Sequence, residues 1–213
     1  MLEASEEGAY SFSPGLSVEE FRRQIGGREF QALQRRLREV RRADDWGAAL
    51  LCSIHRDIFG EHFPESAGRL RMGELNFGRR AALRPEHIES ALQQLVIALR
   101  HELRWAQSRK SEFDEVDAER LFLEIARHHA ELIRIHPFVD GNGRWARFIT
   151  SIFLCDAGFG CGTMIYARDR DEYIRAIDRI IDGNEPGDLA DLLLTGYLDQ
   201  AERRFSGTRP KTP

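Results

Sequence analysis

The chain of 213 residues is long enough for one domain with a small appendage, and its 42% hydrophobic residues exclude a disordered protein. Its 31 basic and 35 acidic residues are interleaved and give a net charge of -4, which provides no basic face for nucleic acid. No apolar run approaches the about 20 residues of a membrane span, and the acidic start MLEASEEGAYSF lacks the apolar core of a signal peptide. Three cysteines without a CxxC pair suit a reducing compartment, so we expect a cytoplasmic protein with no nucleic-acid and no membrane partner.

The first part of the chain is predicted to form short helices followed by a long loop. Helices are expected over residues 17–26, where SVEE has the form of a capping box, and over residues 29–40 and 46–59. Residues 60–84 should form a loop with several Gly and Pro residues. The segment 69–77 (RLRMGELNF) is the best candidate in this loop for a short hairpin.

The rest of the chain has hydrophobic residues spaced three and four apart, which predicts amphipathic helices. Pro85 is suited to the first turn of a helix that ends near residue 105. Pro137 biases His136 away from helical angles, so the helix before it should end there. The remaining helices are expected over residues 116–135, from about residue 142 onward, and over 169–181 and 186–205.

These elements predict an all-α protein, a helical bundle with one small β-hairpin. We expect residues 1–45 to be an N-terminal helical extension and residues 46–205 to be the main domain. The tail over residues 206–213 (SGTRPKTP) should be disordered.

The stretch HPFVDGNGRWAR, residues 136–147, holds the candidate site. The helix expected to begin at Asn142 presents free backbone N–H groups and a partial positive charge at its N-terminus, and both favour an anion. Gly141 and Gly143 allow this backbone to approach a phosphate closely, because no side chain lies between them.

Charged and titratable side chains surround this turn. Arg144 and Arg147 lie near a helix N-terminus, where cations oppose the helix dipole, so they indicate a strongly negative ligand such as a polyphosphate. Asp140 precedes the glycines, and a carboxylate beside phosphates is a natural ligand for Mg2+. His136 ends the preceding helix, and its reference pKa of about 6.5 allows it to act as a base. The stretch therefore predicts a site that holds a nucleotide polyphosphate and its metal and takes a proton from an attacking hydroxyl.

The same stretch closely resembles the signature of the Fic (filamentation induced by cAMP) family, HxFx(D/E)GNGRxxR, and every specified position is filled. Further stretches are similar to the family: residues 55–59 (HRDIF), 63–64 (FP), 67–71 (AGRLR) and 171–174 (DEYI). Residue 66 is a serine where the family commonly has Trp nearby, so the match is looser there. The resemblance covers about residues 46–200.

The resemblance implies an all-helical Fic fold with a β-hairpin flap. It also implies the transfer of a nucleoside monophosphate, usually AMP from ATP, to a Tyr, Ser or Thr hydroxyl of a target protein. In this scheme His136 takes the hydroxyl proton and Asp140 binds Mg2+. The implied phosphate-binding residues are Gly141, Asn142, Gly143, Arg144 and, for the terminal phosphate, Arg147.

The implied flap would clamp the extended backbone of the target by strand pairing. It consists of Leu70, Arg71, Met72, Gly73, Glu74, Leu75, Asn76 and Phe77.

Other chemistries of the same fold remain as alternatives. Doc toxins resemble Fic proteins but phosphorylate their targets, and they carry a lysine in place of the second glycine. Gly143 stands at that position here, which favours nucleotidyl transfer. Phosphocholine transfer from a CDP-type donor is a further option, and so is a nucleotide-binding regulator without turnover, although an intact His136 argues against a pure binder.

Many Fic proteins are restrained by a helix that bears (S/T)xxxE(G/N), whose glutamate pairs with the second motif arginine. The sequence has no full match. Residues 3–8 have the Glu-Gly pair without the leading hydroxyl residue, and residues 195–200 have the threonine followed by Asp and Gln. We therefore expect a toxin or effector that is inhibited by a separate antitoxin protein carrying the inhibitory glutamate.

Overall fold

The computed structural model describes residue 31 and residues 41–109, 112–159 and 170–205, of which 199–205 are described by their helical backbone. The predicted helices over residues 17–26 and 29–40 and the tail over 206–213 lie outside the described residues, except that Gln31 is helical. The boundary predicted at residue 45 stays a prediction. Trp46 and Ala43, on either side of it, are buried in the same core.

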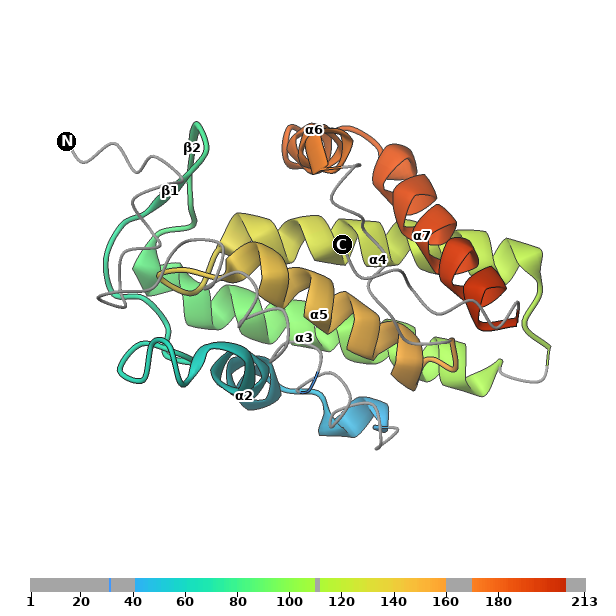
Figure 1. Ribbon diagram of the computed structural model, residues 1–213, viewed down its shortest axis with the longest axis horizontal. Coiled ribbons are helices and arrows are strands. Elements are labelled where there is room, and N and C mark those ends of the chain that lie inside the picture. The colour runs from blue at the N-terminus through green and yellow to red at the C-terminus, as the bar shows by residue number, and fades with distance from the viewer. Residues whose placement is uncertain (1–30, 32–40, 110–111, 160–169, 206–213) are drawn as a thin grey trace.

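The fold is organised around one central helix, α4 (Glu115–Ile135). Its start is capped by Asp114, whose carboxylate accepts a hydrogen bond from the Asp117 N–H at 2.8 Å. Four helices pack against α4: α3 (Pro85–Ser108), α5 (Asn142–Asp156), α6 (Arg170–Ile181) and α7 (Gly187–Phe205). In Figure 1, α3, α4 and α5 run side by side, with α2 (Ala48–Phe59) on one side of them and α6 and α7 on the other.

The chain before α2 is also packed against this bundle. A 3-10 helix, η2 (Ala43–Asp45), lies on α3, and Trp46 is fully buried. The Trp46 indole N–H donates to the Asp156 carboxylate at the end of α5 at 3.0 Å. The start of the described chain is thereby joined to the far end of the helix that begins at the candidate site.

The helix predictions are confirmed among the described residues, with differences at the ends. Pro85 opens α3 as expected, but the helix continues to Ser108 instead of stopping near residue 105. The helix predicted over 46–59 begins at Ala48 because Trp46 and Gly47 have extended backbone angles.

No helix among the described residues is long and apolar enough to cross a bilayer. Cys155 is disulfide-bonded, which the expectation of a reducing compartment did not predict, whereas Cys52 is a free thiol.

The hairpin exists, but its predicted place over residues 69–77 was wrong. Its strands are β1 (Asn76–Phe77) and β2 (Arg80–Ala81), which pair antiparallel with Phe77 opposite Arg80. The turn between them has two residues, and Gly78 supplies the positive φ of +57° that such a turn needs. Gly73, the glycine within the predicted segment, has no positive φ.

Candidate active site

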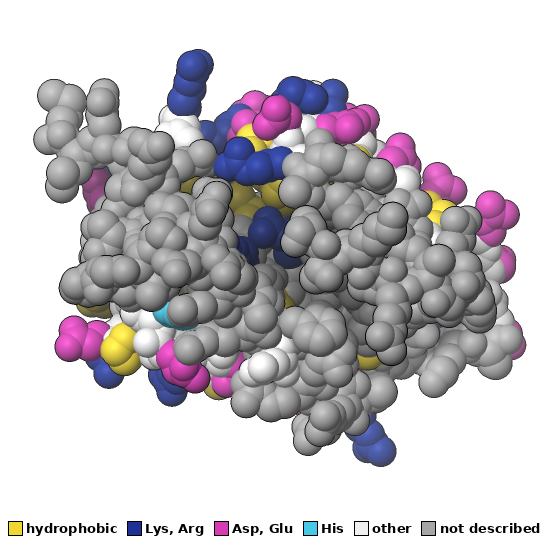
Figure 2. Space-filling view, in the orientation of Figure 1, with side chains coloured by type: hydrophobic (Ala, Val, Ile, Leu, Met, Phe, Trp, Pro, Cys, Tyr) yellow, Lys and Arg dark blue, Asp and Glu magenta, His cyan; other side chains and the backbone are white. Residues whose placement is uncertain are grey.

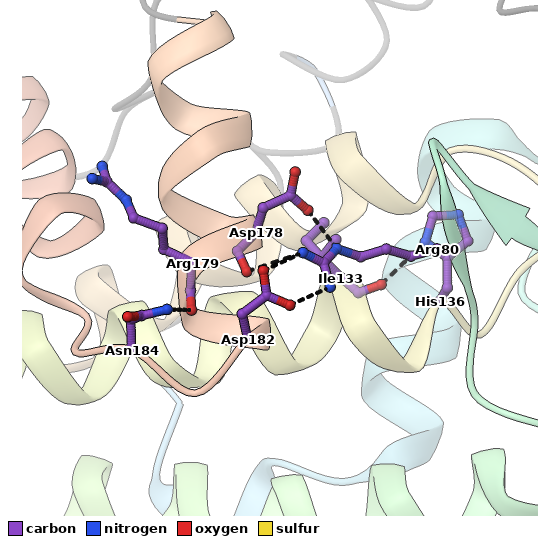
Figure 3. A network of polar contacts seen from close by, with 7 residues as sticks. All are labelled: Arg80, Ile133, His136, Asp178, Arg179, Asp182 and Asn184. Carbon is purple, nitrogen blue, oxygen red and sulfur yellow. Dashed lines mark hydrogen bonds and ion pairs between the residues drawn. The ribbon is translucent and has the colours of Figure 1, made fainter.

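His136 lies where α4 ends and the motif loop, residues 136–144, begins. Its backbone is in the left-handed region, with a φ of 48°. Its ring Nδ1 lies 3.1 Å from the Ile133 carbonyl oxygen, as Figure 3 shows. Because a carbonyl only accepts hydrogen bonds, Nδ1 must carry the proton, and Nε2 is left with its lone pair. The Phe77 ring of β1 stacks on the imidazole, with centroids 4.8 Å apart and planes 5° apart.

Burial lowers the pKa of His136 to about 4, and the nearby Arg71 cation adds to this effect. The hydrogen bond to the Ile133 carbonyl opposes the shift without cancelling it. The imidazole is therefore neutral at physiological pH, with Nε2 able to accept a proton.

The motif loop is closed by the side chain of Asn142, which is 2% exposed. Its Oδ1 accepts from the Phe138 N–H at 3.0 Å, and its Nδ2 donates to the Phe138 carbonyl at 2.8 Å. These two bonds direct the amide into the loop, so the backbone N–H of Asn142 is the group that faces an incoming anion.

Gly141 is the N-cap of α5, and both its backbone angle and its surroundings require glycine. Its φ is +79°, and a Cβ placed there would lie 2.5 Å from the ring of Phe59. Gly143 differs, because a Cβ there would meet only the Arg147 Nη1 at 3.7 Å. Close packing against α2 thus requires glycine at position 141, whereas a side chain at position 143 would have room.

The N-terminus of α5 leaves hydrogen-bond donors available. No described residue accepts a bond from the backbone N–H groups of Asn142, Gly143 and Arg144, as the geometry of a first helical turn requires. Within the described ranges, neither Arg144 nor Arg147 takes part in an ion pair. The helix end is therefore a positive surface with unsatisfied donors.

Asp140 borders this surface. Its carboxylate Oδ1 accepts from the Gly141 N–H at 2.6 Å. Burial raises its pKa, while this hydrogen bond and the charge of Arg144 oppose the rise. Among the described residues there is no group of three or more His, Cys, Asp or Glu side chains that could hold a metal, so Asp140 is a single carboxylate here.

His55 of α2 supports the loop from behind and was missed as a functional residue, although its HRDIF stretch had been noted. It is 2% exposed, and its Nε2 donates to the Asp140 carbonyl at 2.9 Å. Its Nδ1 accepts from the Gly68 N–H at 3.0 Å, and its ring stacks on Phe138 at 3.7 Å. Burial lowers the pKa of His55 to about 4, so one neutral imidazole joins the motif loop to the segment that leads into the flap.

Arg71, predicted to line the flap, is instead 4% exposed and points into the protein. Its guanidinium donates to four backbone carbonyls: His136 at 2.7 Å, Gly73 at 2.7 Å, Ile135 at 3.4 Å, and Leu83. The Arg71 backbone N–H also donates to the Pro137 carbonyl at 2.9 Å. Because α4 ends at Ile135, the cation satisfies carbonyls at the negative end of that helix.

The other predicted flap residues divide by exposure. The exposed ones are Met72, which is 90% exposed, and Gly73, Glu74 and Asn76. The partly buried ones are Leu70, Leu75 and Phe77.

The far strand of the hairpin is tied to α6. Arg80 lies between two carboxylates at the end of that helix, as Figure 3 shows. Its Nε donates to Asp178 at 2.8 Å, and its Nη1 and Nη2 donate to the two carboxylate oxygens of Asp182 at 2.7 Å each. This contact was not predicted, because nothing local in the sequence pairs residue 80 with residues 178 and 182.

The described surface carries both signs of charge. Figure 2 shows acidic and basic side chains interleaved along the upper edge of the molecule, with basic and hydrophobic side chains visible in a hollow near the centre of this face. The mixture agrees with the interleaved charges of the sequence.

The fold and the site define a class of protein: a helical bundle with an anion-binding motif. The N-terminus of α5 offers hydrogen-bond donors beside a neutral histidine, and a residue of the hairpin stacks on that histidine. The Fic/DOC family model matches residues 46–154, about half of the chain. The chain therefore belongs to the Fic/DOC family.

Relatives with assigned names match part of this chain. It is 29% identical over 109 residues to "Protein adenylyltransferase fic-1" of Caenorhabditis elegans, which covers 51% of this chain and 19% of that protein. It is 29% identical over 135 residues to "Protein adenylyltransferase Fic" of Nematostella vectensis, which covers 63% of this chain and 28% of that protein. The chain thus spans less than a third of the length of these relatives.

Solved structures show the same fold. A fragment of Fic-1 from C. elegans superimposes with a TM-score of 0.66 at 22% identity and covers 92% of this chain and 54% of the fragment. BepC of Bartonella tribocorum, solved with bound AMPPNP, superimposes with a TM-score of 0.60 at 20% identity and covers 83% of this chain and 86% of that one.

Proposed function

We propose that this protein is an adenylyltransferase that transfers AMP from ATP to a Tyr, Ser or Thr hydroxyl of a target protein. The observation that carries the proposal is the His136 tautomer: Nδ1 is held by the Ile133 carbonyl, so Nε2 is free to accept a proton. This base lies beside a helix end with unsatisfied N–H donors. The two named relatives are adenylyltransferases, which supports the same reaction.

In the proposed reaction, His136 Nε2 takes the proton of the target hydroxyl as its oxygen attacks the α-phosphorus of ATP. The new oxygen–phosphorus bond forms while the bond from the α-phosphorus to the pyrophosphate oxygen breaks. The backbone N–H groups of Asn142 and Gly143 stabilise the charge on the phosphate oxygens, with Gly141 shaping the turn. Arg144 and Arg147 hold the phosphates of the leaving pyrophosphate, and Arg147 holds the terminal one.

Asp140 fits the role of a Mg2+ ligand. It offers a hard carboxylate oxygen beside the helix end, and Mg2+ in phosphate sites is commonly held by one or two carboxylates together with phosphate oxygens. Bound there, the metal would neutralise charge on the phosphates.

The target is proposed to bind along the hairpin, with its backbone pairing to β1 or to the exposed stretch before it. Met72, Glu74 and Asn76 are exposed in this stretch, and Phe77 connects the hairpin to the His136 ring. We also propose inhibition by a separate antitoxin, because Arg147 forms no ion pair within the described residues and could therefore bind a carboxylate from another chain.

The His136→Ala variant tests the assignment of the base. We expect transfer from α-labelled ATP to a lysate protein to fall about 10²- to 10⁴-fold, with ATP binding retained, because a positioned general base contributes that much. His87→Ala, which removes an exposed histidine of α3, is the matched control and should label like the wild type. Undiminished labelling by His136→Ala would refute the assignment.

The position of the label separates the remaining alternatives. Incorporation from γ-labelled instead of α-labelled ATP would indicate a Doc-like kinase, and transfer only from CDP-choline would indicate phosphocholine transfer. ATP binding without incorporation of any label would indicate a regulator without turnover.

A further inference from the structure

A buried polar chain runs beneath Arg147 and connects three helices. It consists of Thr150 on α5, His129 on α4 and Tyr173 on α6. These side chains are 4%, 1% and 6% exposed, respectively. His129 Nδ1 lies 2.8 Å from Thr150 Oγ1, and His129 Nε2 lies 2.7 Å from the Tyr173 hydroxyl. The proposed reaction uses none of these groups directly.

The Ala146 carbonyl, which can only accept, sets the direction of the hydrogen bonds among Thr150, His129 and Tyr173. Thr150 Oγ1 donates its single proton to the Ala146 carbonyl at 3.0 Å. The hydroxyl oxygen must therefore accept from His129, which places the imidazole proton on Nδ1. Burial lowers the pKa of His129 to about 3, so the ring is neutral and Nε2 accepts from the Tyr173 hydroxyl.

The Tyr173 oxygen, having given its proton to His129, presents lone pairs to its other neighbour. That neighbour is Arg147: its Cζ lies 5.9 Å from the phenol ring centroid, and its charge opposes the rise that burial causes in the pKa of the phenol. A phenol orients a guanidinium without neutralising it, whereas a carboxylate would cancel its charge. An arginine held in this way keeps its full charge for an anion.

We infer that the Tyr173 oxygen accepts a hydrogen bond from the Arg147 guanidinium, and that Tyr173 and His129 are positioning residues that aim this guanidinium at the terminal phosphate of the nucleotide donor. This inference rests on the proposed function, which gives Arg147 that ligand. Thr150 fixes the His129 tautomer, so a hydroxyl on α5 sets the orientation of an arginine on the same helix through two side chains on other helices.

The Tyr173→Phe variant tests the inference by comparing ATP with AMP in calorimetric titrations. Only ATP carries the terminal phosphate, so its dissociation constant should rise about tenfold, as expected when a hydrogen bond to a charged group is lost. The dissociation constant of AMP should change less than twofold. Tyr197→Phe, on α7, is the matched control and should bind both nucleotides like the wild type. An equal loss of affinity for ATP and AMP would show a merely structural role and overturn the inference.

A second pair of variants addresses the tautomer while leaving the phenol in place. Thr150→Val keeps the shape of the side chain but removes the acceptor for His129 Nδ1, and it should reproduce the selective loss of ATP affinity. Thr150→Ser keeps the hydroxyl and should bind ATP like the wild type. If the Thr150→Val and Thr150→Ser variants bind ATP equally well, the hydrogen-bond chain from Thr150 to Tyr173 does not control Arg147.

The side-chain 15N signals of Arg147 provide a readout that does not depend on nucleotide. A guanidinium held by Tyr173 rotates slowly and gives separate Nη signals, which should merge in Tyr173→Phe. If the wild type shows no transfer of an α-label but Arg147 loses its restraint in Tyr173→Phe, the proposed function fails while the positioning chain stands. If α-label is transferred but Arg147 is equally restrained in both proteins, the inference fails alone.

Discussion

The motif loop, residues 136–144, and the flap region, residues 70–84, meet at His136 but are held in different ways. The flap region comprises the flap predicted over residues 70–77 and the rest of the β1–β2 hairpin. The loop is held largely by neighbours in sequence: Asn142 bonds to Phe138, and Asp140 bonds to Gly141. The flap is held by residues far along the chain, because Arg71 reaches the His136 carbonyl and Arg80 reaches Asp178. The loop can therefore keep its shape when the flap moves.

Besides Arg71, two ring side chains join the regions despite this difference. Phe77 stacks on the His136 ring, and His55 hydrogen-bonds both to Asp140 in the loop and to Gly68 before the flap. Arg71 holds the base of the flap so firmly, with its guanidinium and its own backbone N–H, that movement should be confined to the hairpin beyond it.

Glycine-to-alanine substitutions should give the largest difference between the two regions in the free energy of unfolding. Gly141→Ala should lower the free energy of unfolding by roughly 2–5 kcal/mol, since a left-handed alanine costs about 1–2 kcal/mol and overpacking against Phe59 about 1–3 kcal/mol. Gly78→Ala in the hairpin turn has the positive φ but open space, and it should cost only about 1–2 kcal/mol. Urea unfolding curves measure both values.

Gly73→Ala completes this series as the control. A Cβ there meets nothing within 4 Å and the backbone is not left-handed, so stability should change by at most about 0.5 kcal/mol. If Gly141→Ala is no more destabilising than Gly78→Ala, close packing of the loop against α2 does not contribute to its stability.

Acid should weaken the links between the regions before it unfolds the chain. The pKa values of His55 and His136 are lowered to about 4, against about 6.5 in an unfolded chain. Below pH 6.5 the unfolded chain binds protons that the folded chain does not, so stability is complete above pH 6.5 and is lost as pH falls toward 4. The loss is at most about 1.4 kcal/mol per pH unit for each such histidine, and the raised pKa values of Asp140 and Asp156 oppose it at the acid end.

Urea unfolding between pH 7.5 and 4.5 measures this slope. His55→Gln retains a donor and an acceptor without a titrating ring, so the slope should decrease by about one proton. His87→Gln, at an exposed position of α3, should leave it unchanged. A slope in His55→Gln equal to that of the wild type would mean that His55 accepts a proton in the folded protein.

The contrast between the regions also explains what the sequence could predict. The base, the carboxylate and the glycine turn lie within a few residues of one another, so their order was enough to indicate an anion site. The inward direction of Arg71 and the partners of Arg80 depend on contacts 65 and 98 residues apart, which no local pattern contains. The hairpin was predicted over residues 69–77, but the two-residue turn forms at Gly78 and Arg79, just beyond that segment.

Loss of the Arg80 contact should have the smallest effect of these substitutions. It should change the local opening of the hairpin and leave the stability of the whole protein unchanged. In Arg80→Gln, the loss of the bonds to Asp178 and Asp182 should speed amide exchange over residues 76–81 by roughly fivefold or less, while amides of α4 are unaffected. Because these groups are partly exposed, 1 M NaCl should produce much of the same increase in the wild type. Arg79→Gln, in the same turn and exposed, is the matched control and should exchange like the wild type. Equal exchange in both variants would mean that β1–β2 pairing and the Phe77–His136 stack hold the hairpin without the tie to α6, and the flap would then be as locally determined as the motif loop.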